Sequence, residues 1–121
     1  MNMVVGEKKG IVVVRIKEER LDAHISDDFK NELRRIYEGG KKNILVDMTD
    51  VRFIDSSGLG AFVTTLRTAN SHKGMLKLAG LKPQVQALFD LTRLNLILRI
   101  FPTTVEALES DWEKAHGQEF N

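Results

Sequence analysis

Two adjacent hydroxyl side chains, Ser56 and Ser57, lie between an aspartate and a glycine in the turn Asp55-Ser56-Ser57-Gly58. The turn follows an apolar run of strand length at residues 43–48 and precedes apolar residues at helical spacing. We therefore expect it at the beginning of a helix, where backbone N–H groups lack partners within the helix. A serine there can cap the helix, and the same N–H groups can bind an anion. The residue types alone leave both roles open.

The neighbours of the two serines are open to two interpretations as well. Asp55 either caps or solvates the turn, or it orients a site around the serines. Gly58 and Gly60 either let a partner approach the backbone closely or serve helix–sheet packing alone. The apolar residues of the helix are expected mainly in the core, although an exposed one could anchor a partner. They are Leu59, Phe62, Val63 and Leu66.

An enzyme is the class that the sequence favours least. The turn is not the Gly-x-Ser-x-Gly elbow of serine hydrolases, and no P-loop sequence occurs. The histidines, His24, His72 and His116, are scattered and lack metal-ligand spacing. No set of acid, base and nucleophile can be assembled, so we expect no catalytic residues and no cofactor.

A magnesium site is the alternative that the acidic residues raise. Asp47, Asp50 and Asp55 surround the end of the apolar run, and Mg²⁺ favours carboxylate ligands. Loop solubility and turn formation explain Asp50 about equally well. We therefore expect no metal site.

Composition bounds the remaining classes. The chain has 121 residues, no cysteine and a net charge of +1, from 18 Lys and Arg against 17 Asp and Glu. This balance gives no strong field for nucleic acid or an anionic membrane. No apolar run approaches the roughly 20 residues that span a bilayer, and the beginning of the chain does not resemble a signal peptide. We expect a cytoplasmic protein.

Strand and helix patterns alternate along the chain and predict an α/β fold. We expect a hairpin across Lys8-Lys9-Gly10, then a mixed, mostly parallel sheet of four to five strands with about four helices. A single domain is expected over residues 1–121, with its core at about 3–108 and a C-terminal helix and tail that frays from about Ala115. The expected strands are 3–5, 11–16, 43–48, 75–80 and 96–101. The expected helices begin after Ser26 as N-cap, after Asp55, at Pro83 and after Thr103.

Laid out in this way, the chain resembles the STAS domain family, and within it the bacterial anti-anti-sigma factors, also called anti-sigma factor antagonists. The resemblance covers roughly Met3 to Leu108. Four segments carry it in order: Leu21-Asp22-Ala23, residues 45–51 (LVDMTDV), residues 53–60 (FIDSSGLG) and residues 85–94 (VQALFDLTRL). Family members usually begin the first segment with glycine, where this chain has Glu19.

The resemblance implies a protein switch that acts by binding. The unphosphorylated form would bind an anti-sigma factor that is also a serine kinase, and so free the sigma factor. The kinase would phosphorylate the serine after the aspartate, Ser56, and a metal-dependent serine phosphatase would reverse this. The residues expected at the partner surface are Asp22, Asp55, Ser56, Ser57, Gly58, Leu59 and Gly60. The alternative is a STAS subunit of a lipid-transport or sensory assembly that binds a partner or small ligand without phosphorylation.

The resemblance also divides the two serines. Ser57 becomes the predicted helix cap, and Ser56 the predicted phosphate acceptor. Phosphorylation would add about −1.5 to −2 charges, which a helix N-terminus tolerates and a packed partner does not. The oligomeric state stays open.

Overall fold

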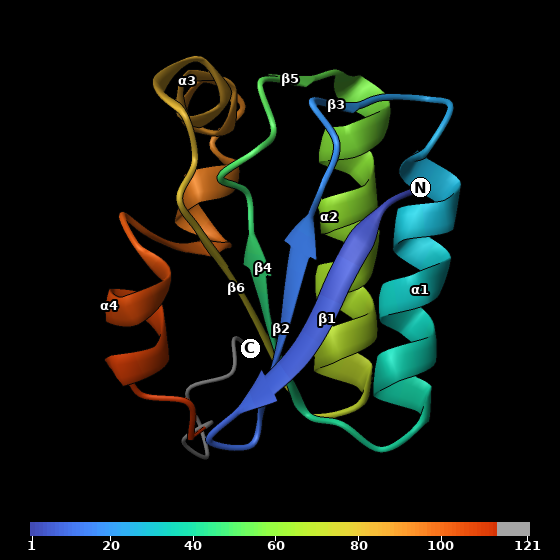
Figure 1. The fold of residues 1–121 in the computed structure, drawn as a ribbon, viewed down its shortest axis with the longest axis vertical. Coiled ribbons are helices and arrows are strands. Elements are labelled where there is room, and N and C mark those ends of the chain that lie inside the picture. The colour runs from blue at the N-terminus through green and yellow to red at the C-terminus, as the bar shows by residue number, and fades with distance from the viewer. Residues whose placement is uncertain (114–121) are drawn as a thin grey trace.

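The computed structural model of this chain describes residues 1–113. The main sheet has the spatial order β1-β2-β4-β6-β7, and β3 and β5 form a separate pair (Figure 1). The strands are β1 (Met3–Lys8), β2 (Ile11–Ile16), β3 (Arg20–Leu21), β4 (Asn43–Asp47), β5 (Phe53–Ile54), β6 (Met75–Ala79) and β7 (Arg99–Phe101). The helices are α1 (Ser26–Glu38), α2 (Ser56–Ser71), α3 (Pro83–Leu91), the short 3₁₀ helix η1 (Leu94–Leu96) and α4 (Thr104–Glu109).

The sheet is mixed in the way that the sequence predicts. β1 and β2 are antiparallel, whereas β2, β4, β6 and β7 pair in parallel. The hairpin turns at Lys9 and Gly10, whose φ angles of 55° and 80° are left-handed. Turns of that hand suit a two-residue hairpin because their twist matches that of the strands. The expected α/β class, strand number and hairpin are confirmed.

Helices α1, α2 and α3 share one core on one face of the sheet, and α4 covers the opposite face (Figure 1). The ring of Phe62 in α2 lies 5.1 Å from that of Phe29 in α1 and 5.7 Å from that of Phe89 in α3. All three side chains are fully buried, so they hold α2 in a fixed position against its neighbours. The smaller cluster under α4 consists of Ile11, Leu45, Ala79 and Ala107.

Two local predictions are wrong. The apolar run at residues 96–101 forms a strand only from Arg99, because Leu96 and Ile97 are 71% and 54% exposed and do not enter the sheet. Ser26 is the first residue of α1 and not its cap, which is Ile25. The Ser26 hydroxyl donates instead to the Asp22 carbonyl.

Other helix boundaries agree with the sequence. Gly39 follows α1, Pro83 begins α3, and the Thr103 hydroxyl accepts a hydrogen bond from the Glu106 amide at 3.1 Å. No helix within residues 1–113 combines the length and apolar character that crossing a bilayer requires. The tail predicted from Ala115 lies outside the described residues.

Candidate functional site

Two short strands bring the two predicted site segments together. β3 and β5 pair in parallel, with Leu21 opposite Ile54. The Glu19 carbonyl accepts hydrogen bonds from the amides of Arg52 and Phe53, at 2.7 and 3.0 Å. Glu19 itself has no left-handed backbone, so the turn does not require glycine at this position. Because β3 leads into Asp22 and β5 into Asp55, the pairing places the two aspartates on the same end of the molecule.

Gly58 is the point of closest approach between these segments. A Cβ at Gly58 would lie 2.4 Å from the Leu21 carbonyl oxygen and 2.6 Å from Cγ1 of Ile54. Such distances are shorter than atoms tolerate, so only glycine lets α2 begin this close to β3 and β5. Gly58 is buried, and the structure shows its packing role. Contact of Gly58 with a partner stays a prediction.

Asp55 is the cap of α2, and the prediction that Ser57 caps the helix is wrong. Asp55 has extended backbone angles, and its Oδ1 accepts a hydrogen bond from the Gly58 amide at 3.1 Å. This is the N-cap geometry in which a carboxylate also complements the helix dipole. Ser56 and Ser57 are the first two helical residues and are exposed.

The Ser56 hydroxyl is accessible. Within residues 1–113, it neither donates a hydrogen bond to another group nor accepts one. The capping carboxylate of Asp55 precedes it, and the α2 N-terminus lies beneath it. Ser56 is exposed at the beginning of α2, and β5 runs into α2 at one end of the molecule (Figure 1).

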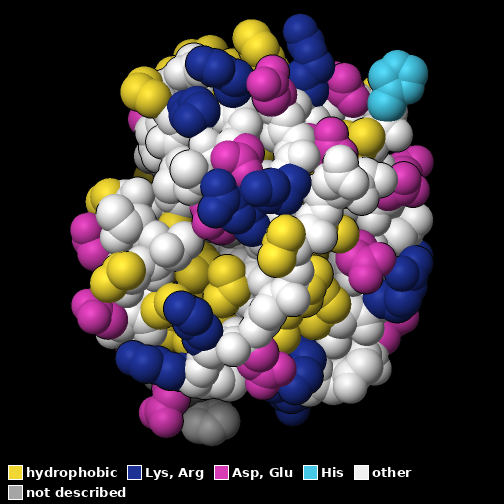
Figure 2. All heavy atoms as spheres, in the orientation of Figure 1, with side chains coloured by type: hydrophobic (Ala, Val, Ile, Leu, Met, Phe, Trp, Pro, Cys, Tyr) yellow, Lys and Arg dark blue, Asp and Glu magenta, His cyan; other side chains and the backbone are white. Residues whose placement is uncertain are grey.

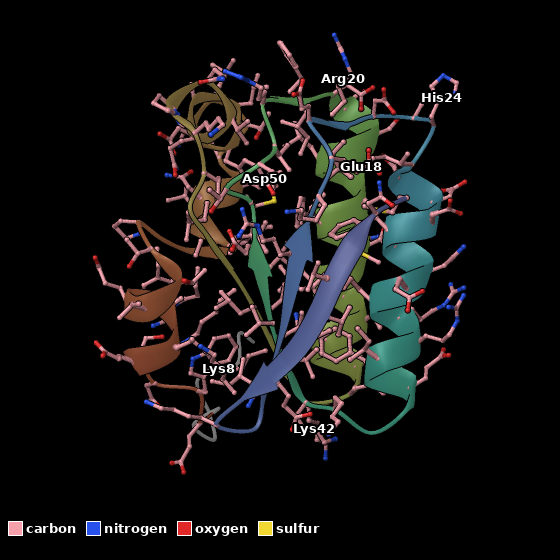
Figure 3. All side chains as sticks on the ribbon, in the orientation of Figure 1. Lys8, Glu18, Arg20, His24, Lys42 and Asp50 are labelled. Carbon is pink, nitrogen blue, oxygen red and sulfur yellow. The ribbon has the colours of Figure 1, made fainter. Side chains whose placement is uncertain are left out.

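Asp22 shapes the loop beside this turn. Its Oδ1 accepts the His24 amide at 3.0 Å, and its carbonyl accepts the Ser26 amide at 2.9 Å. Its side chain is partly exposed, and nearby His24 and Arg20 project from the same end (Figure 3). The structure thus places Asp22 near Ser56 but leaves its contact with a partner as a prediction.

The remaining predicted residues follow along α2. Gly60 is exposed and has open space around its Cα, whereas Leu59 is partly buried against the main core. Phe62 is fully buried, and Val63 and Leu66 are partly buried. Leu59 is the first apolar residue after Ser56 in the sequence of this helix.

The carboxylates that raised the question of a magnesium site do not gather around one point. Asp50 accepts two hydrogen bonds from the Arg15 guanidinium, each 3.1 Å long, and this contact holds the pKa of Asp50 below its ordinary value. Asp47 accepts hydrogen bonds from the amide and hydroxyl of Thr49. Within residues 1–113, no group of three or more His, Asp or Glu side chains is placed to hold a metal ion.

Sequence reasoning missed two exposed residues beside the site, Arg20 and Phe53. The Arg20 guanidinium lies over the Phe53 ring, with its carbon 4.6 Å from the ring centroid. Strands of two residues are too short to show a period, so no sequence signal pointed to this contact.

Comparison with known proteins assigns the fold to a family. The family model that describes the STAS domain matches residues 2–107 of this chain. This chain belongs to the STAS domain family. Among curated STAS relatives, an anti-sigma F factor antagonist from Paenibacillus polymyxa is 29% identical over 83% of this chain and 86% of its own length. An anti-sigma-B factor antagonist from Staphylococcus aureus is 29% identical over 66% of this chain and 74% of its own.

A solved structure agrees with this assignment. A candidate anti-sigma factor antagonist from Thermotoga maritima superimposes with a TM-score of 0.80 at 26% identity, covering 88% of this STAS chain and 92% of its own. The predicted family and fold are therefore confirmed. The names of these relatives describe regulatory antagonists and no enzyme, in agreement with the prediction of a non-enzymatic protein.

Proposed function

We propose that this STAS domain is an anti-sigma factor antagonist whose binding is switched off by phosphorylation of Ser56. The observation that carries the proposal is the exposed, unbonded Ser56 hydroxyl at the first position of a helix already capped by Asp55. The names of the relatives support the antagonist role. The proposed partner is an anti-sigma factor that is also a serine kinase, acting in the cytoplasm, and a metal-dependent serine phosphatase restores the binding form.

The geometry explains why a phosphate would affect binding more than folding. A phosphate on Ser56 adds about −1.5 to −2 charges and three acceptor oxygens. The N-terminus of α2 favours an anion, and the cap does not depend on the serine hydroxyl. A partner packed over Ser56 would instead face added bulk and a second negative group next to Asp55. Unphosphorylated protein therefore binds the kinase and releases the sigma factor, and phosphorylated protein does not.

The partner surface that we propose consists of Asp22, Asp55, Ser56, Ser57, Gly58, Leu59 and Gly60. Their arrangement supports a single contact area, since β3 and β5 bring Asp22 to the beginning of α2. Exposed Gly60, the fifth residue of α2, leaves this part of the helix open to close approach by another backbone.

The test is phosphorylation by the anti-sigma factor kinases of the source organism. Each purified kinase is mixed with this protein and Mg²⁺-ATP, and the modified residue is mapped by mass spectrometry. We expect phosphate on Ser56, none in Ser56→Ala, and normal modification in the matched variant Ser57→Ala. Kinase binding should fall at least about tenfold in Ser56→Asp. Phosphate elsewhere, or full binding by Ser56→Asp, would contradict the proposal. Co-purification with a transporter ATPase in place of a kinase would favour the alternative STAS role.

A further inference from the structure

Arg20 and Phe53 form a cation–π pair on the surface. Phe53 is 51% exposed, and the Arg20 guanidinium carbon lies 4.6 Å from its ring centroid. The two residues are opposite each other in the β3–β5 register, and the Glu19 carbonyl fixes the backbone of both strands. Exposed aromatic and arginine side chains that are already ordered lose little entropy on binding, which makes them effective interface anchors.

Unpaired positive charge continues from this pair along the surface. Arg52, which directly precedes Phe53, lines a shallow hollow together with Lys82, Lys17 and the carboxylates Glu18, Glu19 and Asp50. Lys and Arg side chains are interspersed with Asp and Glu side chains at this end of the molecule (Figure 2). Within residues 1–113, neither Arg20, Arg52 nor Lys82 forms an ion pair. Glu19 is an exposed carboxylate beside them, and it is unpaired in the same range. We call the four residues Arg20, Phe53, Arg52 and Lys82 the basic rim.

The other acidic groups of the hollow are already engaged within the fold. Asp50 is held by Arg15, with Lys17 at 3.9 Å, and Glu18 accepts the Asn2 amide at 2.7 Å. Lys82 also lies within electrostatic reach of Asp50, whereas Arg20 and Arg52 form no ion pair with a carboxylate within residues 1–113. An incoming carboxylate could therefore pair with the rim without displacing an internal contact.

The rim adjoins Ser56 but has the opposite charge from the residues around it. Phe53 lies two residues before Asp55, and Arg20 lies two residues before Asp22. The end of the molecule thus has an acidic half at Asp22 and Asp55 and a basic, aromatic half at the rim. Two halves of opposite charge accept a complementary partner in one orientation and disfavour the reversed one.

We infer that the basic rim is a second part of the partner surface, and that it binds an acidic segment with an apolar side chain on the anti-sigma factor kinase. This inference rests on the function proposed above. The apolar group would cover Phe53, and the carboxylates would pair with Arg20, Arg52 and Lys82. The rim would set the affinity and orientation of the complex and take no part in the transfer of phosphate to Ser56.

The experiment measures the Kd of the kinase for rim variants and the kinetics of Ser56 phosphorylation. For Arg20→Ala and Phe53→Ala we expect a Kd about 10- to 30-fold higher. The first variant loses the charged contact with the kinase, and the second loses the apolar contact. Arg20→Glu should bind more weakly still, and binding by it should depend less on salt. KM for this protein as the kinase substrate should rise in parallel, while kcat stays unchanged.

Matched controls separate the rim from general surface effects. Arg67 is exposed further along α2, and Val105 is 60% exposed on α4, across the sheet. Arg67→Ala and Val105→Ala should leave Kd within about twofold. Circular dichroism should show that every variant is folded, since none of the substituted side chains is buried.

The outcomes distinguish the inference from the function on which it rests. If the wild type binds the kinase and is phosphorylated on Ser56, but the rim variants bind equally well, the inference alone is wrong. A fall in kcat with Kd unchanged would also overturn it. Loss of self-association in Phe53→Ala with normal kinase binding would assign the rim to a second copy of this chain and reject the kinase contact. A wild type that binds no kinase would reject both proposals.

Discussion

The carbonyl oxygen of Leu21 lies so close to Gly58 that a Cβ on the glycine would be 2.4 Å away from it. This contact joins the strand that leads to Asp22 with the helix that begins at Ser56. The two predicted site segments, more than thirty residues apart in the sequence, are therefore held together by a backbone contact that no side chain could replace.

Substitution of Gly58 by alanine should weaken the fold at this contact. We expect Gly58→Ala to lower the free energy of unfolding by about 1–3 kcal/mol, because the new methyl group would force β3 away from α2. Gly60→Ala is the matched control in the same helix, where the Cα faces open space. It should raise stability by about 0.5–1 kcal/mol through helix propensity. Urea denaturation of both variants tests this, and equal effects would contradict it.

The cap of α2 gives a second prediction. Asp55→Ala should lower the free energy of unfolding by about 0.5–2 kcal/mol, since the Gly58 amide loses its acceptor. Asp55→Asn, which keeps an accepting oxygen, should recover most of that loss. Ser57→Ala should stay within about 0.5 kcal/mol of the wild type. If Ser57→Ala were the more harmful substitution, the assignment of the cap to Asp55 would be wrong.

Much of the fold could be predicted because its long elements show a clear period. The strand at residues 43–48 and the apolar face of α2 identified both sides of the Ser56 turn. The family resemblance then directed attention to Ser56 and Asp22. The residue that caps α2 was misjudged because aspartate and serine are about equally good caps, and the sequence does not show at which residue the helix begins.

The contacts around the site could not be predicted for a different reason. β3 and β5 have two residues each, and their pairing depends on how the chain folds back after β2 and β4. The basic rim exists only through this pairing. The sequence likewise does not show that Lys77 in β6 is fully buried, because the pattern of a strand does not reveal which groups will surround one of its side chains.

A negative charge at Ser56 should leave the fold intact. We expect Ser56→Asp to change the free energy of unfolding by no more than about 1 kcal/mol, as the α2 N-terminus favours the charge and Asp55 opposes it. Ser71→Asp places the same charge at the last residue of α2, where the dipole is reversed, and should destabilise. Thermal unfolding at low and high salt compares the two, and the difference should shrink with salt. A large loss for Ser56→Asp would mean that phosphorylation unfolds the domain.

Lys77 is a fully buried lysine beneath the segment that follows α4. Its amine donates to the Ser110 hydroxyl at 2.8 Å and to the Asp111 carbonyl, and lies 4.2 Å from the centroid of the Trp112 ring. Burial lowers the pKa of Lys77 from 10.5 to about 8, and the nearby charge of Arg99 acts in the same direction.

The lowered pKa of Lys77 makes stability depend on pH in a defined direction. Between pH 8 and 10.5 the unfolded chain holds a proton on Lys77 that the folded protein has released, so stability should rise with pH. Burial raises the pKa of Tyr37 above its ordinary 10.0, which opposes the rise at higher pH. Urea denaturation from pH 7.5 to 9.5 should show a gain of about 2 kcal/mol. Lys77→Met should abolish that gain, and Lys8→Met, at an exposed position of β1, should retain it. An equal slope in both variants would show that Lys77 keeps its proton throughout this range.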